Sequence, residues 1–170
     1  MYRQNLPQIM VALNGGRRSR ADHPRLPLSI ADIVNEASKS YKAGARAIHA
    51  HVRDRDQKHC LDAGLYRELI AELSQAVPEM LVQITTESLG IYSPEDQRNL
   101  VQSLRPALVS IARREISKDQ DKNTLKDFYH WAEDEEIGIQ HILYSPNETQ
   151  MLENFVASGI IPANDLELLF

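Results

Sequence analysis

Two histidines, His49 and His51, stand two residues apart in a short apolar run of the chain. Side chains alternate between the two faces of a β-strand, so both imidazole rings would project from the same face. Ile48, Ala50 and Val52 would then pack on the opposite face, against helices. Two neutral imidazoles at the end of a strand could bind a divalent metal such as zinc. A hydrogen-bonded pair of interior histidines would give the same pattern, so the spacing alone leaves both interpretations open.

Further polar residues stand at or just after the other apolar runs. In parallel α/β folds, ligands bind at the carboxyl ends of the strands, so these positions are candidates for a binding site. They include Asn14, Gly15, Thr85, Thr86 and Ser110. The Asn14-Gly15 turn could bind a carboxylate or phosphate through its backbone N–H groups, or it could be an ordinary turn. Glu115 could bind a metal or move a proton, or it could be a surface acid.

Six short apolar runs predict the strands that would position these residues. They cover residues 9–13, 47–52, 81–85, 108–112, 137–143 and 166–170. The segments between them have the apolar spacing of amphipathic helices. The resulting βαβαβαβαβαβ order predicts a parallel sheet with right-handed crossovers.

The helical segments open with recognisable start signals. Ser29, with Asp32 three residues later, forms a capping-box pattern before the first helix, and Asp62 can cap the second. Pro94 predicts the start of the third helix. The backbone N–H at the first position of a helix has no partner inside the helix, so proline, which lacks an N–H, loses no hydrogen bond there. The fourth helix is predicted to begin at Asn123 or Thr124, and the fifth at Asn147.

An open doubly wound sheet and a closed (β/α)8 barrel of the TIM type both show this alternation. No GxGxxG or GxxxxGK[ST] sequence follows a predicted strand, so the usual nucleotide-binding feature of an open sheet is missing from the sequence. A barrel, in turn, has eight strands in about 250 residues, and six are predicted here. The alternation by itself does not decide between them.

The composition is that of an ordinary globular chain. Its 170 residues suffice for one domain, and its net charge of −5 comes without the basic face that nucleic-acid binding requires. No apolar run approaches the roughly 18 residues of a membrane span. Cys60 is the single cysteine, which excludes an intramolecular disulfide and a cysteine-built zinc site. We therefore expect a cytoplasmic protein that binds neither nucleic acid nor membrane.

Two stretches of the sequence carry a resemblance to a known family. The segment from Val11 to Arg17 reads VALNGGR, and the segment from Ala43 to Asp54 contains an AGA…HxHxRD pattern. In order and spacing they resemble the beta-keto acid cleavage enzymes, also called 3-keto-5-aminohexanoate cleavage enzymes. The resemblance implies a (β/α)8 barrel, of which residues 1–170 would be a single domain with about six βα units, truncated at the C-terminus.

The resemblance also implies a reaction. Enzymes of this family exchange acyl groups between a beta-keto acid and acetyl-CoA, which yields acetoacetate and a new CoA ester. Zinc, or another divalent metal, would be held by His49 and His51 and would polarise the substrate's keto oxygen. The implied substrate-binding residues are Asn14, Gly15, Thr85, Thr86 and Ser110, and the implied catalytic residues are Arg53 and Glu115. We expect a homo-oligomer.

The chain departs from the family pattern in ways that keep other functions open. Thr86-Glu87-Ser88 replaces a glycine-rich turn, Gln140-His141 stands where an acid is common, and the family's third metal ligand lies beyond these residues, near strand seven. An inactive remnant or metal-binding scaffold is one alternative, and another metal-dependent barrel enzyme, an aldolase or an amidohydrolase, is a second. Taken alone, residues 1–170 are predicted to have little activity and to self-associate through open strand edges.

Overall fold

The computed structural model describes residues 9–164 and 166–170. These residues form two compact units, which we call the N-terminal unit, residues 9–85, and the C-terminal unit, from residue 86 onward. Each unit repeats the predicted alternation of parallel strands and helices, and each is described by itself below.

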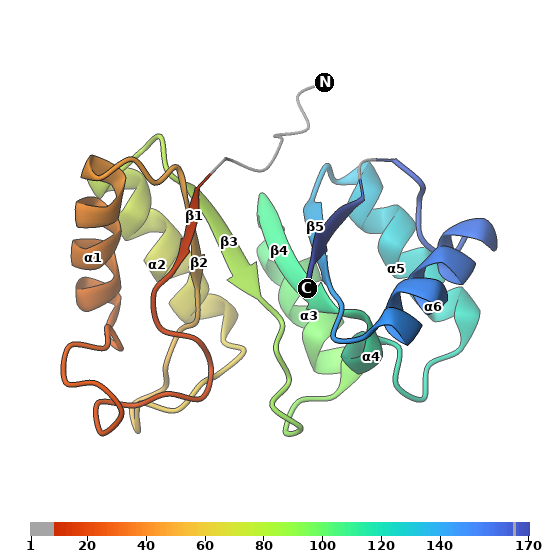
Figure 1. Cartoon of the computed structure of the whole chain (residues 1–170), viewed down its shortest axis with the longest axis horizontal. Helices are drawn as coiled ribbons and strands as arrows, with labels where there is room; N and C mark the ends of the chain where they lie inside the picture. Colours follow the sequence, from red (N-terminus) through yellow and green to blue (C-terminus); the bar gives the residue numbers. More distant parts are fainter. Residues whose placement is uncertain (1–8, 165) are drawn as a thin grey trace. The chain divides into compact units, whose positions relative to one another are not determined.

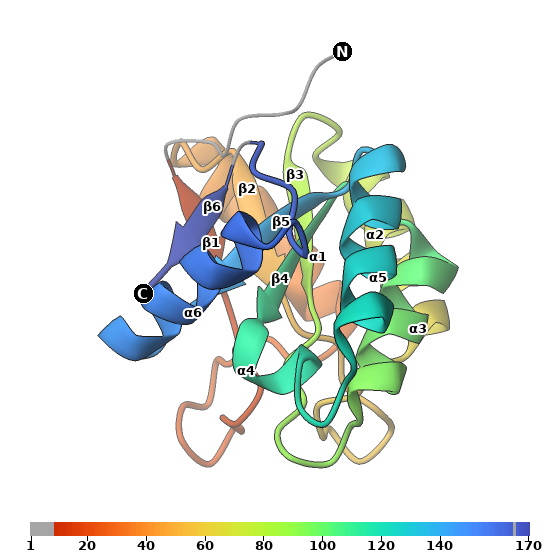
Figure 2. The same cartoon turned by 90° about the vertical axis from the view of Figure 1, so that its right-hand side faces the viewer.

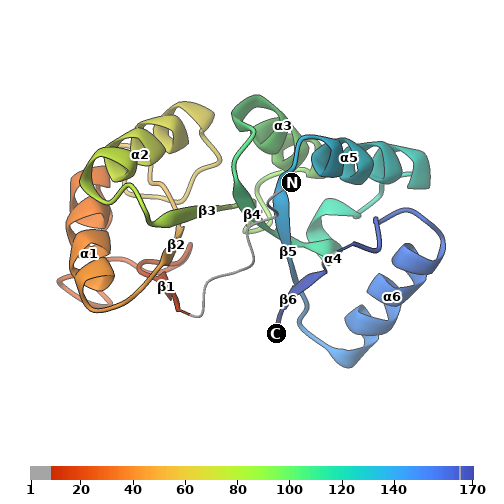
Figure 3. The same ribbon diagram turned by 90° about the horizontal axis from the view of Figure 1, so that it is seen from above.

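The N-terminal unit contains three parallel strands and two helices. The strands are β1 (Met10–Ala12), β2 (Ala47–Ala50) and β3 (Leu81–Thr85), paired in that order. Helix α1 (Ile30–Lys42) joins β1 to β2, and α2 (Ala63–Ala76) joins β2 to β3 (Figure 1). Seen from above, both helices lie on one side of these strands (Figure 3). The loops that follow β1 and β2 therefore start from the same end of the unit.

The starts of both helices follow from local hydrogen bonding. The Ser29 side chain accepts from the backbone N–H of Asp32, and the Asp32 carboxylate accepts from the backbone N–H of Ser29. Asp62 accepts from the backbone N–H of Leu65 at 2.8 Å. These bonds satisfy N–H groups that have no partner inside a helix, which confirms the predicted caps.

The apolar core of the N-terminal unit packs on the face of β2 opposite His49. Ile48, Ala50 and Val52 are buried, with at most 1% of their surface exposed. Leu69 and Leu73 of α2 are fully buried as well. An apolar face on one side of β2 leaves its other face for polar side chains, as the period-two spacing predicts.

The C-terminal unit repeats the same order with one additional short helix. Its elements are α3 (Pro94–Leu104), β4 (Leu108–Ala112), α4 (Arg113–Ile116), α5 (Lys122–Asp134), β5 (Gly138–Ile142), α6 (Pro146–Ala157) and β6 (Glu167–Leu169). The three strands are parallel and paired in chain order (Figure 2). All five residues of β4 are buried. The six predicted strands are thus all present, and β3 and β4 have the predicted bounds.

Two predicted helix starts are wrong by one or two residues. Helix α5 begins at Lys122, because Asp121 caps it by accepting from the backbone N–H groups of Asn123 and Thr124. Helix α6 begins at Pro146, with Ser145 as its cap. In both cases another capping residue stands shortly before the predicted start, and the short helix α4 has no start signal of its own.

The helices are short and amphipathic. The longest in the described part of the chain, α2, has 14 residues. Spanning a bilayer takes about 20 apolar residues. Between residues 9 and 164 and over residues 166–170, no helix has both the length and the apolar character needed to cross a membrane.

Candidate functional site

His49 of β2 and His51, the first residue after this strand, meet at their ring tips. The Nε2 atoms of His49 and His51 lie 3.1 Å apart, and the ring centroids are separated by 5.0 Å in an edge-to-face arrangement. Residues two apart on a strand share a face, which brings the two rings together as the spacing predicts. The Nε2 atoms therefore converge on one point in space.

The other ring nitrogen of His49 is fixed by the neighbouring strand. His49 pairs with Gln83 of β3 in the parallel register, so both side chains project from the same face. The Nδ1 atom of His49 lies 2.7 Å from Oε1 of Gln83. With the Gln83 amide in this orientation, its oxygen accepts the hydrogen bond, which assigns the proton to Nδ1 and the lone pair to Nε2.

The backbone of His51 is held by Asn14, which follows β1. The Asn14 side-chain amide donates to the carbonyl of His51 at 2.8 Å and to the carbonyl of Pro27 at 3.1 Å. Its carbonyl oxygen accepts from the N–H of His51 at 3.2 Å. Asn14 thus fixes the position of His51, and its predicted contact with a substrate stays a prediction.

A short hairpin brings a third histidine to the pair. Arg53 and His59 form an antiparallel bridge, and Asp54 closes the turn between them by accepting from the N–H of Lys58. His59 is buried, and its Nδ1 lies 3.4 Å from Nδ1 of His51. His59 was not among the predicted site residues. Its signal was the polar turn after Arg53, since residues paired across a hairpin face the same side.

Arg53 belongs to the same cluster. It stands two residues after His51 and is 7% exposed, so its guanidinium lies on the histidine face of the strand. One of its terminal nitrogens donates to the backbone carbonyl of Gly15. Gly15 has a positive φ of 58°, a conformation that glycine adopts without strain. The loop after β1 is thereby tied to the loop after β2.

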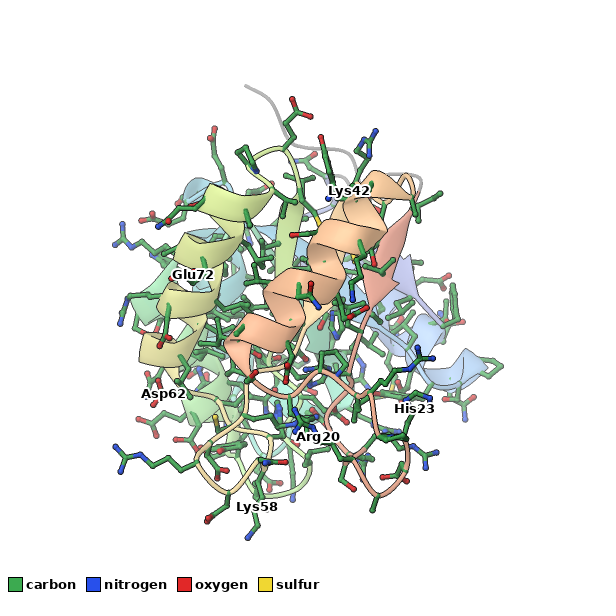
Figure 4. All side chains as sticks on the ribbon, turned by 90° about the vertical axis from the view of Figure 1, so that its left-hand side faces the viewer. Arg20, His23, Lys42, Lys58, Asp62 and Glu72 are labelled. Atoms are coloured by element: carbon green, nitrogen blue, oxygen red, sulfur yellow. The ribbon has the colours of Figure 1, made fainter. Side chains whose placement is uncertain are left out.

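The remaining charged groups of these loops lie on the surface. Arg18 pairs with Asp22 at 2.9 Å and Arg20 with Asp32 at 2.7 Å, with all four side chains well exposed. Figure 4 shows Arg20 at the loop end of the N-terminal unit, away from Lys42 at the far end of α1. Exposed pairs of this kind contribute little to stability.

Burial keeps the histidines neutral. It lowers the pKa of His49, and it lowers the pKa of His51 to about 2, with further contributions from His49, His59 and Arg53. Neutral imidazole is the form that binds metals. The charge of Arg53 acts in the same direction on His51, so protonation does not compete with metal binding near neutral pH.

The histidine pair fits part of a zinc site. Two ligand nitrogens at about 2.0–2.1 Å from a tetrahedral ion lie roughly 3.3 Å from each other. The separation of 3.1 Å between the two Nε2 atoms is close to that value. Within residues 9–164 and 166–170, no group of three or more histidine, cysteine or acidic side chains is placed to hold a metal ion. The supply of two metal ligands by His49 and His51 therefore stays a prediction.

The C-terminal unit holds three other predicted residues. Glu115, on α4, accepts from the backbone N–H of Ser88 at 2.9 Å. The Thr86 hydroxyl donates to the Ser110 carbonyl at 3.2 Å. The Ser110 hydroxyl is buried and has no hydrogen-bond partner among the described residues. These contacts tie the segments after β3 and β4 to each other, inside this unit.

The predicted residues thus fall into two sets. Those in the N-terminal unit are His49, His51, Asn14, Gly15, Arg53 and Thr85, and those in the C-terminal unit are Thr86, Ser110 and Glu115. Three contacts join the first five of the N-terminal set in pairs: His49 with His51, His51 with Asn14, and Arg53 with Gly15. Buried Thr85 lies at the end of β3, and its carbonyl accepts from Tyr66. The expected proximity of Glu115 to the histidines stays a prediction.

Comparison with protein families gives a match over nearly the whole chain. The model of the beta-keto acid cleavage enzyme family matches residues 8–170. A 3-keto-5-aminohexanoate cleavage enzyme of Fusobacterium nucleatum subsp. nucleatum is 32% identical over 78 residues, which are 46% of this chain and 29% of that protein. A 3-oxoadipate:acetyl-CoA acetyltransferase of Cupriavidus necator is 25% identical over 109 residues, 64% of this chain and 38% of that protein.

Solved structures agree on the fold. The apo structure of ObcA superimposes with a TM-score of 0.68 and 14% sequence identity, over 86% of this chain and 36% of that chain. At this identity the likeness concerns the fold, and it confirms the predicted (β/α)8-barrel class with about six βα units. The chain spans about a third of the length of the relatives it matches.

Proposed function

Because the chain belongs to the beta-keto acid cleavage enzyme family, we propose that it takes part in zinc-dependent acyl exchange between a beta-keto acid and acetyl-CoA. Acetoacetate and a new CoA ester would be the products. The name of the Cupriavidus necator relative supports acetyl-CoA as the co-substrate. A homo-oligomeric state and a cytoplasmic location remain predictions from the sequence.

His49 and His51 would hold the metal through their Nε2 atoms. The chemistry that zinc supplies when bound is Lewis-acid polarisation of a carbonyl oxygen, here the keto oxygen of the substrate. Gln83 would keep His49 in the tautomer whose Nε2 is a ligand, and Asn14 would keep the His51 backbone in place. Gln83 and Asn14 would therefore hold both histidines in position before a substrate binds.

Other residues would bind and orient the substrate. The guanidinium of Arg53 is a cation on the histidine face of β2, suited to a substrate carboxylate. In the C-terminal unit, the buried Ser110 hydroxyl can donate a hydrogen bond, and the Glu115 carboxylate can accept a proton. Asn14, Gly15, Thr85 and Thr86 would also contribute to substrate binding.

One observation carries this proposal: the Nε2 atoms of His49 and His51 meet at 3.1 Å while Gln83 holds the first ring from behind. A pair of structural histidines needs only one bond between the rings. The additional bond to Gln83 directs a lone pair toward the meeting point, as a metal ligand requires.

Metal-dependent binding of a beta-keto acid tests the proposal without depending on turnover. Calorimetry would compare a beta-keto acid with the matching saturated acid, which lacks the keto oxygen, on the zinc-loaded 170-residue chain. We expect the keto acid to bind at least about 10-fold more tightly, and the preference to disappear after zinc removal. His23→Gln, a change at an exposed histidine, should leave it intact.

The possible results separate the alternatives. A chain that binds zinc without any preference for the keto acid would be a metal-binding scaffold. A preference that survives zinc removal, or that persists in His51→Ala, would contradict the assigned role of the histidine pair.

A further inference from the structure

We propose that His59 is a positioning residue for His51, and that it switches its Nδ1 atom from hydrogen-bond donor to acceptor when a metal binds. The inference rests on the proposed metal site. It assigns a task to a histidine outside the HxHxRD pattern, on the far arm of the hairpin that follows β2.

The hairpin gives His59 a fixed place. Its backbone is paired with Arg53, and the next residue, Cys60, donates its N–H to the carbonyl of Val52 at 3.4 Å. The turn is closed by Asp54, whose carboxylate accepts from the N–H groups of Asp56 at 2.9 Å and Lys58 at 2.8 Å. His59 is only 4% exposed, so its ring is held by backbone pairing and by packing.

The three rings form one hydrogen-bonded row. His49 and His51 meet through Nε2 at 3.1 Å, and His51 and His59 meet through Nδ1 at 3.4 Å, with ring centroids 5.1 Å apart. Each nitrogen of the central ring therefore faces a nitrogen of a neighbouring imidazole. In each such pair, one nitrogen must donate and the other must accept.

Gln83 fixes the direction of this row in the metal-free protein. Since Nδ1 of His49 donates to Gln83, Nε2 of His49 is an acceptor. His51 must then carry its proton on Nε2, and its Nδ1 becomes an acceptor. Consequently His59 donates from Nδ1.

A metal at the meeting point requires the opposite arrangement of His51. Its Nε2 must offer a lone pair, so the proton of the neutral ring has to reside on Nδ1. His59 then accepts at its Nδ1 and carries its own proton on Nε2. The count is unchanged: the proton on Nδ1 of His59 passes to Nδ1 of His51, one proton leaves Nε2 of His51, and one is taken up at Nε2 of His59.

Few side chains can serve both states. A backbone carbonyl or a carboxylate accepts only, and a lysine donates only. Imidazole does either by changing tautomer, and a glutamine amide does either by turning over. Leucine fills a similar volume and does neither. The inference can therefore be tested by comparing histidine, glutamine and leucine at position 59.

Zinc affinity measured by competition with a chromophoric chelator tests the inference on the full 170-residue chain. His59→Leu should weaken zinc binding roughly 10- to 100-fold, the usual effect of losing a partner of a metal-bound histidine. His59→Gln should stay within a few-fold of the parent chain, because the amide restores the bond. The matched control His23→Gln, in an exposed loop, should have no effect.

A second measurement does not depend on any variant folding. Nitrogen-15 NMR of the histidine rings in the parent chain should show His51 protonated on Nε2 without metal and on Nδ1 with one equivalent of zinc. His51 protonated on Nδ1 in both states would overturn the switch.

The outcomes separate this inference from the proposed function. Zinc binding by the parent chain with unchanged affinity in His59→Leu would overturn the inference and leave the metal site standing. Equal losses in His59→Gln and His59→Leu would also overturn it, since the amide should suffice. A parent chain that binds no zinc would overturn both.

Discussion

Buried polar side chains are arranged differently in the two units. In the N-terminal unit, His49, His51 and Gln83 point toward one another and are hydrogen-bonded. In the C-terminal unit, Tyr129 and His141 are buried, but the tyrosine hydroxyl and Nδ1 of the histidine have no hydrogen-bond partner among the described residues. Their rings only pack together, with centroids 5.7 Å apart.

The difference distinguishes polar groups that are positioned to bind a ligand from polar groups whose burial only destabilises the fold. Burying a polar group without a hydrogen bond destabilises the fold, whereas a bonded and convergent set is positioned for a ligand. Arg113 shows the same cost in the C-terminal unit: its Nε has no partner among the described residues, and its guanidinium lies over the Phe155 ring at 5.7 Å. Buried histidine alone is therefore a weaker sign of function than buried histidines whose nitrogens converge.

The largest expected effect lies in metal binding. Replacing His49 or His51 by alanine removes a proposed ligand, so zinc affinity should fall by at least about 100-fold, more than the loss of an outer partner. His141→Gln, at a histidine buried as deeply as His51, should leave zinc affinity unchanged. Chelator competition measures all three variants. Equal losses at His141 and His51 would erase the distinction between the two units.

The next effect is a dependence of stability on pH. Burial lowers the pKa of His141 to about 4, against 6.5 for the free side chain. The unfolded chain therefore takes up a proton that the folded chain refuses, and the free energy of unfolding falls as the pH drops from about 6.5 to about 4. The loss from this group is on the order of 3 kcal/mol.

Urea unfolding across that pH range checks the assignment. His141→Gln should remove one proton's share of the pH dependence, while His23→Gln, at an exposed position, should not. An identical pH dependence in parent chain and His141→Gln would show that His141 does not resist protonation.

A pair of tyrosines sharpens the comparison between partnered and unpartnered groups. The Tyr66 hydroxyl in the N-terminal unit lies 3.4 Å from the carbonyls of Ala50 and Thr85, whereas the equally buried Tyr129 hydroxyl has no partner among the described residues. Tyr66→Phe should cost about 1 kcal/mol in urea unfolding, and Tyr129→Phe should be neutral or stabilising by a similar amount. The reverse order would mean that the Tyr129 hydroxyl is satisfied in solution, for example by a buried water.

The smallest effect should be the same in both units. Ser29 and Ser93 each form a capping box, so alanine at either position should cost about 1 kcal/mol of stability. Ser74→Ala, at an exposed position in the last turn of α2, is the control and should not destabilise. A large difference between the two caps in chemical denaturation would indicate that local rules act unequally in the two units.

The features that follow from such local interactions could be predicted from the sequence. The caps at Ser29 and Asp62 and the shared face of His49 and His51 depend on residues at most three apart, so their patterns are visible along the chain. The family resemblance added the barrel class, which the alternation alone left open. Local signals failed where two possible capping residues stand close together, as at Asp121 before α5, and at the short helix α4, which has no side-chain cap.

The partners of the histidines could not be predicted in the same way. Gln83 meets His49 because the register of β2 and β3 pairs them, and a register depends on residues far apart in the sequence. His59 reaches His51 because the turn at Asp54 places it opposite Arg53. The sequence shows only a polar loop there. The number of residues in the turn determines which side chain lies opposite Arg53 and beside His51.

The central claim is that one divalent ion binds to both His49 and His51. Zinc K-edge X-ray absorption of the chain loaded with one equivalent of zinc counts imidazole ligands directly. We predict two imidazole nitrogens at about 2.0 Å in the parent chain, and one in His49→Ala loaded to the same stoichiometry. A spectrum with no imidazole ligand, or one that His49→Ala leaves unchanged, would contradict the account.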